Sequence, residues 1–135
     1  NRMDTSNAWA DVLDRVQYEP AKKAALILIE GFGKAGLSPS QKGGVTSSVR
    51  FHDEYGRYIL SFICNRADLL FYVRKPAIRA VSTLPSQAAE RFRDVTTNTA
   101  NECKIRIQSG SEAEDLLGWL APLLPLPFPL KHQAR

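Results

Sequence analysis

The chain has 135 residues, of which 44% are hydrophobic and 24% are charged, and its formal net charge is +4. This composition excludes an intrinsically disordered chain, and two cysteines are too few for a disulfide scaffold. No apolar run approaches the roughly 18 residues that a membrane span needs. Residues 4–17 contain no apolar core of the secretory type. We therefore expect a cytoplasmic protein that does not contact a membrane.

Two helices are predicted at the start of the chain. The first covers residues 7–17, whose apolar positions share one helical face: Trp9, Val12, Leu13 and Val16. The second begins near Pro20, which suits the first turn of a helix, and ends at Gly33 and Gly36. Together with Gly31 these glycines match the G-x-G-x-x-G pattern of dinucleotide sites. No helix is expected directly after Gly36, so we interpret the glycines as a helix stop.

The central part of the chain is typical of antiparallel hairpins. A loop rich in Ser, Pro and Gly is predicted over residues 37–44. Three strands follow over residues 45–52, 58–64 and 69–75, with apolar side chains at alternate positions. The connections between these strands are short and rich in turn-forming residues, as hairpins require.

The last third of the chain mixes helix and strand. Residues 76–85 are expected to form an irregular connection bracketed by prolines, and residues 86–94 a short helix. Residues 102–108 alternate apolar and basic side chains and predict a fourth strand. Residues 111–120 predict a final helix, because its first positions have capping-box spacing.

The resulting order, α-α-β-β-β-α-β-α, predicts an α+β fold in which an antiparallel sheet packs against helices. We expect a single domain over residues 3–121, followed by a proline-rich apolar tail over residues 122–135. Cys64 and Cys103 fall in apolar strand patterns and are expected to be buried free thiols.

The tail combines four prolines with large apolar residues, so we expect it to be extended. Leaving it in water would expose leucine and phenylalanine side chains. The favoured interpretation is that the tail packs across the core of its own domain. The alternative is that it packs on a second copy or on a partner protein. Packing on a second copy would make the protein a homodimer or a larger homo-oligomeric interaction protein.

Positive charge is concentrated in the three-strand region. Residues 50–79 hold six positive and three negative residues, a local net charge of +3. Arginines interleaved with tyrosines suit phosphate contacts and base stacking. We predict a surface for an acidic partner, either nucleic acid or an acidic protein, made by Arg50, Arg57, Tyr58, Arg66, Tyr72, Arg74 and Lys75. The alternative is a solvated sheet face on which these cations pair across strands with Asp53, Glu54 and Asp68.

No arrangement typical of an active site is evident, so we expect a small non-catalytic binding protein with no cofactor and no metal. One enzymatic alternative stays open, because the element order is similar to that of the core of PD-(D/E)xK nucleases. Such a metal-dependent nuclease would use Asp68, Glu102 and Lys104. Those enzymes carry the acid-x-Lys motif on the third strand, whereas Glu102 and Lys104 lie on the fourth. The alternative requires these side chains to meet around one ion.

Overall fold

The computed structural model describes residues 9–42, 47–98 and 101–127. Over these residues, the antiparallel sheet has the strand order β1-β2-β3-β4-β6-β5. Its strands are β1 (Ser38–Lys42), β2 (Ser48–His52), β3 (Tyr58–Cys64), β4 (Leu69–Val73), β5 (Val95–Thr97) and β6 (Cys103–Ile107). The helices are α2 (Ala10–Leu13), α3 (Glu19–Lys34), α4 (Lys75–Ala80), α5 (Leu84–Arg91), α6 (Gly110–Leu120) and the 3-10 helix η1 (Ala121–Leu123). The predicted α+β fold is confirmed.

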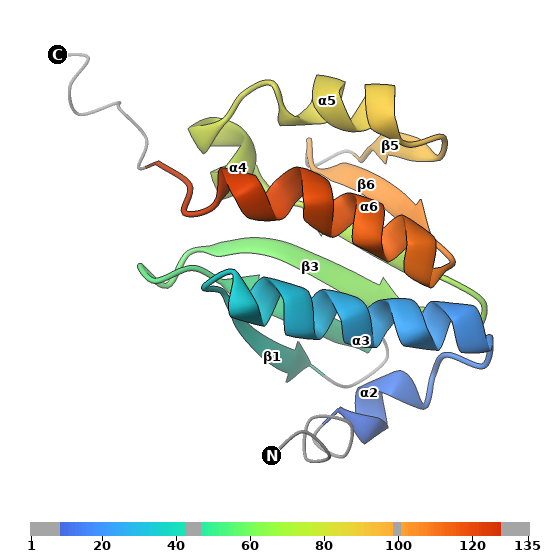
Figure 1. Cartoon of the computed structure of the whole chain (residues 1–135). Helices are drawn as coiled ribbons and strands as arrows, with labels where there is room; N and C mark the ends of the chain where they lie inside the picture. Colours follow the sequence, from blue (N-terminus) through green and yellow to red (C-terminus); the bar gives the residue numbers. More distant parts are fainter. Residues whose placement is uncertain (1–8, 43–46, 99–100, 128–135) are drawn as a thin grey trace, which may run out of the picture.

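The two long helices, α3 and α6, lie side by side across one face of the sheet (Figure 1). Gly31 permits their close approach, because a Cβ atom there would lie 2.3 Å from Leu117 Cδ1. Gly36 follows α3 with a φ of +106°, a conformation that glycine adopts without steric cost. Gly31 of the G-x-G-x-x-G pattern therefore serves helix packing and Gly36 serves helix termination, whereas Gly33 lies inside α3 and does not end it.

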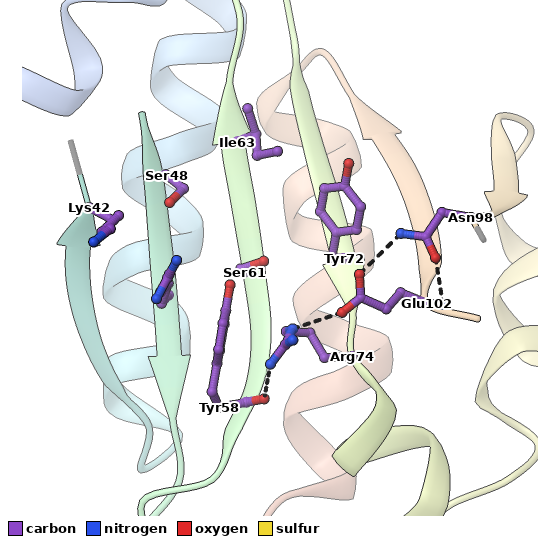
Figure 2. Close-up of a pocket in the computed structure, with 10 residues that line it drawn as sticks. Lys42, Ser48, Tyr58, Ser61, Ile63, Tyr72, Arg74, Asn98 and Glu102 are labelled. Atoms are coloured by element: carbon purple, nitrogen blue, oxygen red, sulfur yellow. Dashed lines mark hydrogen bonds and ion pairs between the residues drawn. The ribbon is translucent and has the colours of Figure 1, made fainter. Parts of the chain in front are cut away.

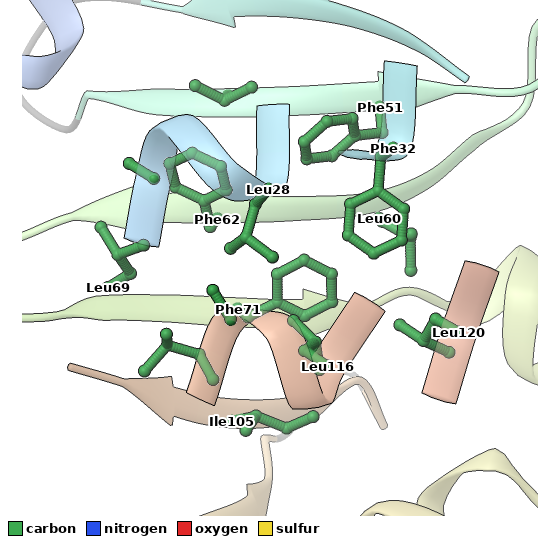
Figure 3. Packing of buried hydrophobic residues seen from close by; sticks show 14 of the residues in the cluster. Leu28, Phe32, Phe51, Leu60, Phe62, Leu69, Phe71, Ile105, Leu116 and Leu120 are labelled. Atoms are coloured by element: carbon green, nitrogen blue, oxygen red, sulfur yellow. The ribbon is translucent and has the colours of Figure 1, made fainter. Parts of the chain in front are cut away.

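The core lies between this helical layer and the sheet (Figure 3). Phe32 of α3 contacts Phe51 of β2 and Phe71 of β4, with ring centroids 5.2 and 5.8 Å apart. Cys64 and Cys103 are buried in this layer as free thiols, as predicted. Because alternate strand residues point to opposite faces, the residues between these core positions face away from the helices.

Several elements differ from the predicted boundaries. Residues 38–42 of the expected loop form β1, residues 75–80 form α4 and residues 95–97 form β5. β1 and β5 are edge strands with mostly exposed side chains, so neither carries the apolar alternation that marks a buried strand. Pro39 is tolerated in β1 because an edge strand can lack one backbone donor.

The beginning of the tail packs on its own chain. Leu126 is only 5% exposed and belongs to the core. Arg57 donates from Nη2 to the Leu126 carbonyl at 3.1 Å and from Nη1 to the Pro127 carbonyl at 3.2 Å. Pro122 lies in the helical turn η1, so the start of the tail is not extended as predicted, and Leu124 is the first residue after it with extended backbone angles. Residues 128–135 lie outside the described residues, and the shared tail of a homodimer stays a prediction.

Candidate functional site

The face of the sheet turned away from α3 and α6 is polar and positively charged. We call it the open face. Its strand registers align Arg50 with Ser61, Ser61 with Tyr72, and Tyr72 with Lys104 in one row across four strands. A neighbouring row aligns Lys42, Ser48, Ile63, Leu70 and Arg106. Residues far apart in the chain thus share one surface.

A hollow of about 500 Å³ lies on the open face (Figure 2). The small side chains of Ser48 and Ser61 lie between larger ones; they are 8% and 5% exposed. The hollow exists because these two positions leave space beside the rings of Tyr58 and Tyr72. It is lined by Lys42, Ser48, Arg50, Tyr58, Ser61, Ile63, Tyr72, Arg74, Asn98 and Glu102.

Two arginines contact the Tyr58 ring at the wall of the hollow. The Cζ atom of Arg50 lies 4.9 Å from the ring centroid, and that of Arg74 lies 3.8 Å from it. Since β3 lies between β2 and β4, these guanidinium groups approach the ring from neighbouring strands on opposite sides. Each cation–π contact contributes about 0.5–1 kcal/mol. Tyr58 therefore holds two positive groups close together.

The two arginines differ in their remaining partners. Arg74 Nε donates to Glu102 Oε2 at 2.8 Å, and its Nη1 donates to the Tyr58 carbonyl at 3.1 Å. Asn98 orients the carboxylate, because its Nδ2 donates to Glu102 Oε1 at 3.1 Å. Arg50 forms no ion pair within the part of the chain that the structure describes, and its buried Nε has no hydrogen-bond partner there.

An unsatisfied buried donor costs about 1–3 kcal/mol. Lys42, Arg50 and Arg74 line the hollow against the single carboxylate of Glu102, so its lining has a net positive charge. An anion in the hollow would meet the Arg50 guanidinium group, which has no carboxylate partner in the described structure.

Tyr72 lies differently from Tyr58. Figure 2 shows the Tyr72 ring face-on and the Tyr58 ring edge-on, so Tyr72 lies flat against the sheet while Tyr58 stands upright. Burial raises the pKa of the Tyr72 hydroxyl, and the negative charge of Glu102 adds to this effect. The phenol therefore stays protonated at neutral pH and presents an uncharged ring.

The structure brings together four of the seven predicted binding residues: Arg50, Tyr58, Tyr72 and Arg74. Lys75 is exposed at the start of α4 and does not line the hollow. Arg66 is exposed in the turn after β3, where its carbonyl accepts hydrogen bonds from the backbone N–H groups of residues 17 and 18. Arg57 pairs with Asp53, Nε to Oδ2 at 2.6 Å, and also holds the C-terminal segment. These three residues lie outside the hollow.

Lys42, Asn98 and Glu102 are site residues that sequence reasoning did not place in the binding surface. Lys42 lies on the unrecognised β1, and Asn98 directly follows the unrecognised β5. Cross-strand ion pairs are also present. Asp68, one of the carboxylates expected to pair, contacts Arg106, whereas Arg74 pairs with Glu102, which was not among them. Ion pairing therefore accounts for part of the charge on the open face but not for Arg50.

The expected metal-binding arrangement of the nuclease alternative is wrong. Leu69 pairs with Ile107 at one end of the β4–β6 ladder, and Val73 pairs with Cys103 at the other. Asp68 and Glu102 therefore lie at opposite ends, roughly 20 Å apart at the usual rise per strand residue. Within the described ranges, no group of three His, Cys, Asp or Glu side chains is placed to hold a metal ion.

None of the described helices is both long enough and apolar enough to cross a membrane; the cytoplasmic location stays a prediction. No protein-family model, curated protein or solved structure compared with this chain matches it.

Proposed function

We propose that this chain is a non-catalytic binding protein that holds an acidic ligand in the hollow of the open face. Arg50 carries the proposal. Its guanidinium group lines the hollow, it has no carboxylate partner among the described residues, and its buried Nε lacks an acceptor. A phosphate or carboxylate in the hollow would pair with this guanidinium group, because guanidinium groups bind both anions through charge-assisted hydrogen bonds.

The surroundings of Arg50 support the same ligand chemistry. Lys42 lines the hollow and, like Lys104 on the far side of Tyr72, forms no ion pair within the described part of the chain. Glu102 pairs with Arg74 and leaves the other cations unneutralised. Clustered charges of one sign in a concave surface attract ligands of the opposite sign and accelerate their association.

Fluorescence anisotropy with labelled oligonucleotides and with a labelled polyglutamate peptide tests this proposal at low and moderate salt. Arg50→Gln removes the central cation. Lys34→Gln is the matched control, because it removes one positive charge from the exposed end of α3, on the covered side of the sheet. We expect Arg50→Gln to weaken binding by about 1.5–3 kcal/mol, the contribution of a hydrogen bond to a charged group.

Both variants should keep the circular dichroism spectrum of the parent protein, since neither residue forms an ion pair in the described structure. Lys34→Gln should also keep the melting temperature, and Arg50→Gln should lose no more than about 0.5–1 kcal/mol of stability, the contribution of its cation–π contact with Tyr58. If neither polyanion binds at low salt, or if Arg50→Gln binds as tightly as Lys34→Gln, the proposal is overturned.

A further inference from the structure

We propose that the acidic ligand is a single-stranded nucleic acid, with one base stacked on the ring of Tyr72 and a neighbouring phosphate bound by Arg50. This inference rests on the proposed function, because it specifies which ligand occupies the hollow of the open face. It assigns different roles to the two tyrosines that line the hollow.

The two tyrosine rings differ in whether they can receive a base. Tyr58 already has Arg50 and Arg74 within 5 Å of its ring centroid, on opposite sides. Tyr72 lies flat against the sheet, and its cross-strand neighbour on β3 is the small Ser61. A planar group entering the hollow can therefore stack on Tyr72. Such stacking tolerates every base, because each has a π-face.

The order of residues across the sheet matches the alternation of anion and ring in a nucleotide chain. Arg50 and Tyr72 are separated only by Ser61, hence by two strand spacings, or about 10 Å. A phosphate at its guanidinium group would leave the attached sugar and base above Ser61 and Tyr72. Lys104, the next residue in the row, is placed for the following phosphate.

The apolar part of the open face favours nucleic acid over an acidic peptide. Ile63 and Leu70 pair directly across β3 and β4, and both are partly exposed beside the row that contains Tyr72. The carboxylates of an acidic peptide would satisfy the cations but would place nothing flat or apolar against this strip. Each nucleotide supplies both an anion and a planar ring. Stacking on Tyr72 also requires an unpaired base, since the faces of bases in a duplex are covered by their neighbours.

Anisotropy measurements on the full chain separate the base from the phosphates. The probes are a labelled single strand, its duplex, and an abasic single strand with the same number of phosphates. Tyr72→Leu removes the ring, and Tyr72→Phe keeps it. Tyr18→Leu is the matched control, because Tyr18 is exposed before α3 and outside the hollow.

We expect Tyr72→Leu to weaken single-strand binding by about 5- to 150-fold, the range for loss of one stacked base. Tyr72→Phe and Tyr18→Leu should bind as the parent protein does. The abasic strand should bind more weakly than the ordinary strand and should not distinguish Tyr72→Leu from the parent. A 2-aminopurine base in the single strand should be quenched by the parent protein and less so by Tyr72→Leu.

The outcomes distinguish this inference from the proposed function. Equal binding of the ordinary and abasic strands, both weakened by Arg50→Gln, would overturn base stacking while keeping an anion site. Arg50-dependent binding of polyglutamate without binding of either strand would also overturn the inference, and would identify an acidic protein as the partner. Absence of any Arg50-dependent binding would overturn both the stacked base and the anion site. Circular dichroism melts of the Tyr72 variants establish that they remain folded.

Discussion

Arg57→Ala is expected to release the C-terminal segment from the domain. Asp53 Oδ1 accepts hydrogen bonds from the backbone N–H groups of Tyr55 and Arg57 at 3.0 and 2.9 Å, and its Oδ2 accepts from Arg57 Nε. The two remaining nitrogens of the same guanidinium group donate to the carbonyls of Leu126 and Pro127. One side chain thus links the β2–β3 turn to the end of the described chain. We call this arrangement the Arg57 clasp.

The cost of removing the clasp follows from burial. The side chains of Asp53 and Arg57 are only 5% and 15% exposed, so alanine would leave a buried carboxylate without its cation. Breaking such a pair costs about 3–5 kcal/mol. We expect Arg57→Ala to lower the free energy of unfolding by about 3 kcal/mol, the lower end of this range, because two backbone N–H groups still stabilise the Asp53 carboxylate. Leu126→Ala should cost about 2 kcal/mol, the lower end for a buried leucine, since the end of a chain can relax.

Urea unfolding provides the assay, followed by the fluorescence of Trp119, which is buried on α6. Arg57→Ala, Leu126→Ala and the double variant form a double-mutant cycle. If Arg57 holds Leu126 in place, Leu126→Ala should cost at least about 1 kcal/mol less in the Arg57→Ala background. Arg79→Ala, at an exposed arginine of α4, should change little.

If the losses of stability in the two single variants add up to the loss in the double variant within about 0.5 kcal/mol, the clasp is refuted. They would mean that Leu126 packs in the core without help from Arg57. Ligand binding is a separate test of the same residue. Arg57→Ala should leave oligonucleotide affinity unchanged under conditions where the variant is folded, because Arg57 does not line the hollow.

Three further predictions concern the core and the hollow. Gly31→Ala would place a methyl group against Leu117 and should lower the free energy of unfolding by about 1–2 kcal/mol in thermal melts. Adding Leu117→Ala should recover part of this loss. If Gly31→Ala alone is as stable as the parent protein or more stable, close packing at Gly31 is contradicted. Burial raises the pKa of the Cys64 thiol to about 12 from 9.0. Between these two pH values the unfolded chain loses the thiol proton and the folded chain keeps it, so the free energy of unfolding should fall by about 1.4 kcal/mol per pH unit. Cys64→Ala should reduce this pH dependence in urea titrations, and an unchanged pH dependence would exclude Cys64 as its origin. Tyr58→Leu removes the ring between two guanidinium groups and should weaken anion binding in anisotropy measurements by about 1 kcal/mol or more. Tyr58→Phe keeps the ring and should bind anions as the parent protein does. Equal affinity of the two variants would show that the ring does not hold the arginines in place.

The sequence predicted the buried elements well. Apolar residues recur with helical spacing in α3 and α6, and with strand spacing in β3, β4 and β6. Burial against the core imposes this periodicity, so it can be recognised locally. The Arg/Tyr pattern likewise identified four residues that line the hollow. Arg50 and Tyr72 lie between core positions of their strands and therefore face the other side of the sheet. Tyr58 has the parity of the core residues of β3 and lines the hollow where the register with β2 shifts, which strand alternation does not predict.

The edge strands and the partners of each charged side chain were decided by tertiary structure. β1 and β5 are stabilised by backbone hydrogen bonds to a neighbouring strand, and neither has an apolar pattern of its own. Whether an arginine is paired depends on strand order and register. These place Glu102 beside Arg74, separate it from Asp68, and leave Arg50 without a carboxylate in the described structure. Such contacts join residues distant in the chain, so local periodicity determined the layers of this protein, whereas long-range strand pairing determined its site.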